Sequence, residues 1–123
     1  MIAGIGIDIV SVSRIAEKIQ HNGFKEKIFS LSEREYCERN NNNAQHYAVR
    51  FAAKEAFLKA TGRGLMAGYN LKDIAIAIDE LGKPSIMLAN SFQELENLNS
   101  WSAIHLSLSH EGDSAIAMVI IEK

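Results

Sequence analysis

The sequence has little of what disulfide-bonded or zinc-built scaffolds need. Among its 123 residues there is a single cysteine, Cys37. One cysteine cannot form an internal disulfide, so the stability of the fold does not depend on an oxidising compartment. The four histidines show no zinc-ligand spacing either, which argues against the familiar cysteine–histidine zinc sites.

The common nucleotide and hydrolase motifs are also missing. The segment "GIGID" has no third glycine and is not a dinucleotide fingerprint, and no G-x-x-x-x-G-K-[ST] loop occurs. "SLSH" places a serine near a histidine, but the G-x-S-x-G elbow of α/β-hydrolases is absent. These absences argue against a Rossmann enzyme, a P-loop enzyme and a serine hydrolase.

Neither sign of charge dominates. Thirteen lysines and arginines face 15 acidic residues, which gives no field strong enough to make nucleic acid the main partner. No run approaches the ~18 apolar residues of a membrane span, and "MIAGIGIDIV" has no basic region before its apolar residues. We therefore expect one soluble, cytoplasmic domain over residues 1–123, with no membrane or nucleic-acid partner.

The hydrophobic pattern predicts an α+β fold. Residues 2–10 alternate, with Ala3, Ile5, Ile7 and Ile9 on the face expected to pack and Gly4, Gly6 and Asp8 on the other. The later elements expected are helices at 13–21, 24–29 and 33–39 (the last from a Ser32–Glu35 capping box), a long helix at 44–60, a hairpin of 73–79 with 84–89, a helix at 91–98 capped by Ser91 or Asn90, and strands at 103–109 and 114–123. The last strand is apolar on both faces, which predicts a central place. The result is a mostly antiparallel sheet packed against a long buried helix.

The stretch "RFAAKEAFLKATGRG" predicts a buried helix that nevertheless carries charge. Apolar residues point in nearly every direction on a helical wheel, which is typical of a core helix, and Gly62 is a natural stop. Glu55 and Lys59 lie one turn apart, as do Arg50 and Lys54. Burial raises the pKa of a carboxyl group unless a cation or a metal compensates.

Asp8 and Glu55 suggest a magnesium site. They come from separate elements, and two carboxylates with open coordination positions are what Mg²⁺ uses when phosphate oxygens complete its octahedron. Lys59, Arg50 and Lys54 would then be phosphate counter-charges. The alternative is that Glu55 and Lys59 form an ordinary i,i+4 pair and that Asp8 caps the following helix.

Ser109 and His110 are further candidates. Strict strand alternation places them on opposite faces, so they share a site only if the strand ends there. Taken alone, His110 is a strand-end residue. Gly62 and Gly64 would let backbone amides approach a phosphate, but a helix C-terminus has the wrong polarity for an anion, and Lys59 or Arg63 must supply the charge.

Five segments together resemble a known family. In order and over nearly the whole chain, "GIGIDIV", "LSEREYC", "RFAAKEAFLKATGRG", "LGKP" and "LSLSH" resemble the holo-[acyl-carrier-protein] synthases, the small phosphopantetheinyl transferases of bacterial fatty-acid synthesis. The resemblance implies transfer of 4′-phosphopantetheine from coenzyme A to a serine of apo-acyl carrier protein, with release of adenosine 3′,5′-bisphosphate. It implies that Asp8 and Glu55 bind Mg²⁺, that Glu55 or a metal-bound water takes the serine proton, and that Lys59 neutralises the leaving phosphate. The positions that it places near coenzyme A are Arg50, Lys54, Lys59, Gly62, Ser109 and His110.

The resemblance also implies partners. A half-sized unit of this family forms a homotrimer with its sites at subunit interfaces, and acidic carrier proteins dock on basic residues, here Arg14 with Lys18 and His21. The segment "RNNNNAQHY" lacks the basic residues that the family usually has before its long helix, and Arg39 and His46 are candidates to replace them. Two other functions stay open: a magnesium-dependent phosphohydrolase acting on coenzyme A or nucleotides, and a non-catalytic module that binds a carrier protein.

Overall fold

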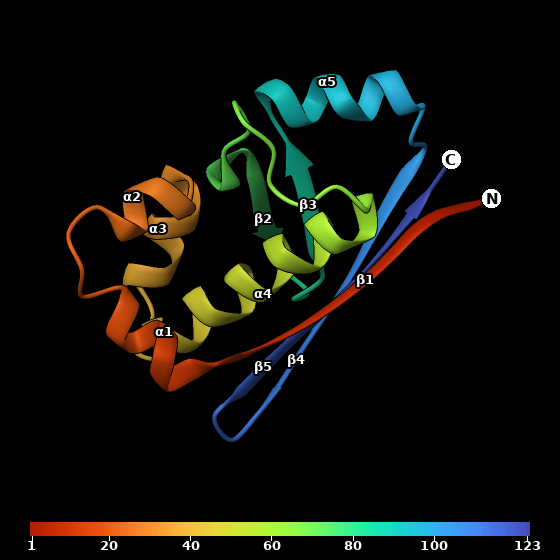
Figure 1. The fold of residues 1–123 in the computed structure, drawn as a ribbon. Coiled ribbons are helices and arrows are strands. Elements are labelled where there is room, and N and C mark those ends of the chain that lie inside the picture. The colour runs from red at the N-terminus through yellow and green to blue at the C-terminus, as the bar shows by residue number, and fades with distance from the viewer.

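The computed structural model describes all residues, 1–123, as three helices and a strand around one long helix, followed by a hairpin, a helix and two long strands. The elements are β1 (Ile2–Ser11), α1 (Val12–Lys18), α2 (Phe24–Ile28), α3 (Leu31–Glu38), α4 (Asn43–Thr61), a short 3-10 turn (Leu71–Asp73), β2 (Ile74–Ile78), β3 (Pro84–Leu88), α5 (Asn90–Asn99), β4 (Ala103–Glu111) and β5 (Ser114–Glu122). Figure 1 shows α4 lying across the sheet, α1 to α3 at one end of it and the two chain termini side by side at the other. The predicted α+β fold is confirmed.

The strands form two antiparallel units. One is a three-stranded sheet in the order β1-β5-β4, and the other is the β2–β3 hairpin. β5 is central, as its two apolar faces predicted: Ala115, Ala117 and Val119 point into the core, while Ile116 and Met118 lie on the opposite face. β1 and β4 are therefore the two edges of the sheet.

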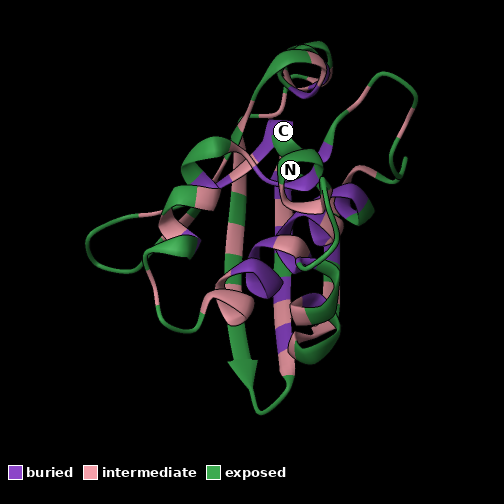
Figure 2. Cartoon of the chain, turned by 90° about the vertical axis from the view of Figure 1, so that its left-hand side faces the viewer, coloured by how far each residue is buried: buried purple, intermediate pink, exposed green.

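Helix α4 is the core of the molecule. Eleven of its 19 residues are buried, and Gly62, at φ 74°, ends it in the left-handed conformation. Alanines and straight-chain residues dominate its sequence, which favours the helix intrinsically, and burial on several sides supplies most of its stability. Figure 2 shows the buried residues in the interior elements and the turns exposed. Neither this helix nor any other is long and apolar enough to cross a membrane.

The packed face of β1 is the glycine face, which reverses our expectation. Ile5, Ile7 and Ile9 are 64%, 60% and 62% exposed, whereas Gly6 is buried. A Cβ on Gly4 would lie 1.9 Å from the Ala60 carbonyl oxygen, and a Cβ on Gly6 would lie 2.0 Å from that of Ala56. The strand backbone thus touches the helix backbone, and only glycine permits this approach.

Two predicted helix caps are also wrong. Helix α3 starts two residues earlier than expected, and its capping box joins Ser30 to Glu33 rather than Ser32 to Glu35. Both pairs fit the S-x-x-E pattern, and the difference is that Glu33 is buried and has further partners in the core. Helix α5 begins after Ala89 without a side-chain cap, so neither Ser91 nor Asn90 has that role.

Candidate active site

The close contact between β1 and α4 brings Asp8 to the charged face of the helix. Asp8 follows Gly6 by two residues and lies on the same side of β1. Lys59 Nζ donates to Asp8 Oδ1 at 3.0 Å and to the Ile7 carbonyl oxygen at 2.9 Å. The Asp8 side chain is 16% exposed and that of Lys59 is 55% exposed. The ion pair therefore lies at the protein surface beside β1, where the Lys59 side chain is in contact with solvent and Asp8 is mostly buried.

Glu55 completes this group. It is half-buried, and its pKa is raised first by burial and then by the negative charge of Asp8; Lys59 and Lys18 act in the opposite direction. Asp8 and Glu55 therefore lie close enough to repel each other. Such a pair of acids is stabilised by a cation placed between or beside them.

The donor set fits magnesium better than a transition metal. No group of three or more His, Cys, Asp or Glu side chains able to hold a metal occurs in the structure. Two carboxylates suit Mg²⁺, because this ion keeps several positions for water or phosphate oxygens. The other reading, in which Asp8 caps a helix, is wrong: Ser11 caps α1, and Asp113 accepts further hydrogen bonds there from Ser13 N and Oγ.

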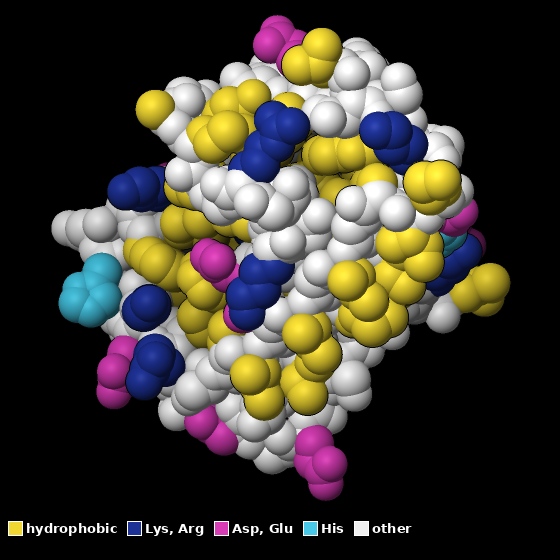
Figure 3. Space-filling model, turned by 45° about the vertical axis from the view of Figure 1, so that its right-hand side comes forward, with side chains coloured by type: hydrophobic (Ala, Val, Ile, Leu, Met, Phe, Trp, Pro, Cys, Tyr) yellow, Lys and Arg dark blue, Asp and Glu magenta, His cyan; other side chains and the backbone are white.

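Two cavities adjoin the acids. One of about 410 Å³ is lined by Glu55, Leu58, Lys59, Gly62, Gly64, Leu65 and Leu71. A second, of about 310 Å³, is lined by Ile7, Asp8, Ile9, Lys59 and Ile116. Lys59 forms part of both walls. Figure 3 shows basic and acidic side chains among hydrophobic ones on one face of the molecule.

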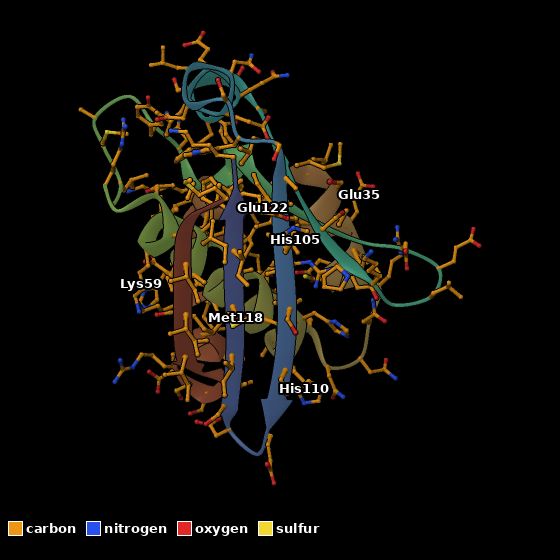
Figure 4. The ribbon with its side chains drawn as sticks, turned by 90° about the vertical axis from the view of Figure 1, so that its right-hand side faces the viewer. Glu35, Lys59, His105, His110, Met118 and Glu122 are labelled. Carbon is orange, nitrogen blue, oxygen red and sulfur yellow. The ribbon has the colours of Figure 1, made fainter.

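Ser109 and His110 belong to a different cavity. This space, of about 260 Å³, is lined by Gln45, His46, Val49, Ile78, Gly82, Pro84, Leu108, Ser109 and His110. Both residues lie near the end of β4. They line the same cavity although consecutive residues of a strand point to opposite faces of the sheet. Figure 4 shows Lys59 at the β1 edge of the sheet and His110 at the β4 edge. A single chain therefore does not bring the acids and this cavity together.

Arg50 lies one helical turn after His46, which lines this cavity. It is 1% exposed, its guanidinium stacks 4.5 Å from the centre of the Tyr36 ring, and Nη1 donates to the His46 carbonyl oxygen at 3.1 Å. Its Nε is buried without a hydrogen-bond partner. Arg50 also lines a small cavity with Tyr36 and Arg39. A buried donor without a partner fits a residue that binds an anionic ligand.

Lys54 is a structural residue, and its expected contact with a phosphate is wrong. Its side chain is fully buried, and Nζ donates to Glu33 Oε1 at 2.8 Å and to the carbonyl oxygens of Leu71 and Ile74. All three ammonium hydrogens are therefore used inside the protein. Burial lowers the pKa of Lys54, and Glu33 opposes that shift.

The basic residues expected to meet a carrier protein lie at the surface. Arg14 and Lys18 are exposed on α1, and His21 is exposed just after it. The Lys18 ammonium lies 5.8 Å from the centre of the Phe51 ring on α4 and acts on the pKa of Glu55. The exposed face of α1 therefore adjoins the acid pair.

Sequence reasoning missed several residues of these cavities. Gln45 and Pro84 line the β4 cavity, and Tyr36 stacks on Arg50. It also missed Glu33, whose carboxylate joins α3, α4 and β2. The one available signal was the second S-x-x-E pattern at Ser30, because an acid in that position has a second possible use.

The chain is similar to proteins of known activity along its whole length. A family model described as the 4′-phosphopantetheinyl transferase superfamily matches residues 4–119. A holo-[acyl-carrier-protein] synthase of Geobacter sp. (strain M21) is 45% identical over 125 residues, covering 100% of both chains. One from Treponema denticola is 46% identical over 123 residues, covering 99% of both chains.

Solved structures show the same fold. The holo-[acyl-carrier-protein] synthase of Neisseria meningitidis has a TM-score of 0.92 at 36% identity and covers 100% of both chains. The Helicobacter pylori synthase, in complex with coenzyme A, has a TM-score of 0.83 at 32% identity over 96% of this chain and 99% of that one. The Bacillus anthracis synthase, in complex with CoA (3′,5′-ADP), has a TM-score of 0.83 at 34% identity, covering 100% of this chain and 98% of that one.

Proposed function

The chain belongs to the 4′-phosphopantetheinyl transferase superfamily, and from this premise we propose that it transfers 4′-phosphopantetheine from coenzyme A to a serine of an apo-acyl carrier protein. It is an enzyme, and the relatives it matches along its length are holo-[acyl-carrier-protein] synthases. The observation that carries the proposal is the meeting of Asp8, Glu55 and Lys59 at the contact between β1 and α4.

Asp8 and Glu55 would hold Mg²⁺. The ion, when bound, neutralises charge on the pyrophosphate of coenzyme A. The carboxylates themselves fix its place, since the glycine contacts hold β1 against α4 and leave Asp8 little freedom to move. Lys59 binds Asp8 and is at the same time exposed to solvent, and from this position its ammonium neutralises the charge of the phosphate that leaves.

In the reaction the serine hydroxyl oxygen of the carrier protein bonds to the β-phosphorus, and the bond from that phosphorus to the bridging oxygen breaks. The bridging oxygen leaves with its electron pair as part of adenosine 3′,5′-bisphosphate. The hydroxyl proton passes to a Glu55 carboxylate oxygen, directly or through water. Positioning and charge neutralisation then account for most of the catalysis, as in other phosphoryl transfers.

The cavity at the end of β4 would take the nucleotide end of coenzyme A. Ser109 and His110 line it, and Arg50 lies one helical turn from its wall at His46. Gly62 lines the larger cavity beside Glu55 and Lys59 and leaves room there for the pantetheine arm. Lys54 has no part in this binding, because its side chain is buried.

The enzyme acts, on this proposal, as a homotrimer with shared sites. Ile5, Ile7 and Ile9 form an exposed apolar row that pairs across the sheet with β5, where Met118 is 37% exposed. An apolar face of this kind on one side of a sheet favours association. Asp8 lies on β1, the edge strand beside Lys59, and His110 lies at the β4 edge, so a second copy seated on this face brings one subunit's acids to the next subunit's cavity.

The carrier protein would dock on α1. Arg14, Lys18 and His21 offer positive charge to an acidic partner, and α1 adjoins Glu55, where the serine must arrive. Since both proposed substrates, the acyl carrier protein and coenzyme A, are cytoplasmic, the proposal also implies that the enzyme acts in the cytoplasm.

Release of the nucleotide product tests the proposal against a phosphohydrolase that would use the same acids with water as nucleophile. Coenzyme A and Mg²⁺ are incubated with the protein, with and without apo-acyl carrier protein, and adenosine 3′,5′-bisphosphate is measured chromatographically. The transferase releases it only when the carrier is present. Equal release without the carrier would favour the hydrolase.

A further inference from the structure

The cavity at the end of β4 contains two imidazoles. His46 lines it from α4 and His110 from β4, with Gln45 and Ser109 beside them. The His46 ring meets the Tyr36 ring edge-on at 5.5 Å, and its carbonyl oxygen accepts from Arg50. His46 is thus held from two sides at the wall of a space large enough for a small ligand.

The charges that act on His46 are all basic. Arg50 faces it from α4 and His110 from β4, the phenol of Tyr36 covers it from α3, and the hairpin wall consists of Ile78, Gly82 and Pro84, none of which titrates. Burial, then Arg50, then His110 lower the pKa of His46. The imidazole is therefore neutral at neutral pH while the cavity is empty.

We propose that His46 is an anion-binding residue of this cavity and takes up one proton when a phosphorylated ligand enters beside it and His110. The proton comes from solvent to the free ring nitrogen, and the imidazolium then donates a charge-assisted hydrogen bond to a phosphate oxygen. The ligand brings the negative charge that the empty cavity lacks. The inference rests on the proposed binding of the nucleotide end of coenzyme A at this cavity.

Proton uptake gives the affinity a defined pH dependence. The pKa of His46 is low in the free protein and higher in the complex, so the complex binds more protons than the free protein between the two values. Affinity therefore rises as pH falls through that window, by up to about tenfold per pH unit for one proton. Above the window this dependence disappears.

The test is a titration of the histidine ring carbons by NMR, with and without adenosine 3′,5′-bisphosphate, on the whole protein. His46→Gln assigns the His46 signal, and His105→Gln serves as the control because His105 lies exposed on β4, bonded to Glu122. We expect the bisphosphate to raise the pKa of His46, and the uncharged nucleoside adenosine to leave it unchanged. His46→Gln should also lose the proton uptake seen by calorimetry in two buffers of different ionisation enthalpy, and His105→Gln should keep it.

Two results would overturn the inference, and they have different consequences for the proposed function. Binding of the bisphosphate with the pKa of His46 unchanged rejects proton uptake alone and leaves the transferase proposal standing. No binding of the bisphosphate at all rejects the cavity as the nucleotide site, and the inference about His46 with it.

Discussion

Lys59 Nζ lies 3.0 Å from Asp8 Oδ1, although 51 residues separate the two along the chain. The contact exists because Gly4 and Gly6 let β1 lie directly on α4. With Glu55 beside them, these residues form the charged group on which the proposed chemistry depends.

Asp8→Asn and Glu55→Gln should each abolish transfer while the protein remains folded. Each change removes a carboxylate charge and keeps the side-chain volume. We expect activity to fall by at least about 10²-fold, the scale for removing one group that stabilises transition-state charge, and the circular dichroism spectrum to stay the same. Full activity in both variants would show that the acids do not bind the metal.

Glu55→Gln should also make the protein more stable near neutral pH. Burial and Asp8 raise the pKa of Glu55 in the folded state, so the ionised form is favoured more in the unfolded chain, and stability falls as pH rises through the window above the unfolded pKa. The melting temperature of the variant should exceed that of the wild type at pH 7, with the difference vanishing below the unfolded pKa of about 4.3. An equal or lower melting temperature at pH 7 would mean that the ionised Glu55 carboxylate is not disfavoured by its surroundings in the folded state.

Gly6→Ala should displace Asp8 and destroy activity. The new Cβ would lie 2.0 Å from the Ala56 carbonyl oxygen, and overpacking of this kind costs about 1–3 kcal/mol. Gly68→Ala is the control, since nothing lies within 4 Å of a Cβ on Gly68 and only its positive φ of 82° opposes an alanine there. We expect chemical denaturation to show a loss in both variants, and transfer to be lost only in Gly6→Ala. Transfer at the wild-type rate in Gly6→Ala would contradict the role of this contact.

Glu33→Gln should destabilise the fold by about 3–5 kcal/mol, the usual effect of removing one partner from a buried ion pair. Lys54 would be left charged and buried, with Glu33 no longer an anion. Glu35→Gln on the same helix is the matched control, because Glu35 is exposed, and surface changes of this kind stay within about 0.5 kcal/mol. Urea unfolding measures both, and equal stability of the two variants would refute the role of the pair.

Ile7→Glu should give a monomer without transferase activity. Ile7 is 60% exposed on the outer face of β1 and also lines the cavity with Asp8 and Lys59, so a charge there opposes burial between subunits. Met87→Glu, at an exposed position of the β2–β3 hairpin, should leave both mass and activity unchanged. Light scattering gives the mass, and an Ile7→Glu variant that remains an active trimer would contradict the proposed interface.

The sequence alone predicted much of this molecule, because periodicity and glycine placement are local signals. The long helix and the central position of β5 follow from such patterns, and the same patterns singled out Asp8 and Glu55 as candidate metal ligands, which stays a prediction. The faces of β1 did not, since three isoleucines normally mark the packed side. Here the helix backbone occupies the glycine side, and the isoleucines are left for a partner subunit in our proposal.

The function of Lys54 could not be read from the sequence either. Helical spacing places it one turn from Arg50, but its partner Glu33 is 21 residues away, and only the three-dimensional packing brings Lys54 and Glu33 together. The capping box was misplaced for the same reason, because Ser30–Glu33 and Ser32–Glu35 differ only in burial.

The most direct test of the central claim is the intact mass of an apo-acyl carrier protein incubated with this protein, coenzyme A and Mg²⁺. We predict a gain of one phosphopantetheine group on the carrier, lost on adding a chelator and in Glu55→Gln. A carrier of unchanged mass in the complete mixture would contradict the account.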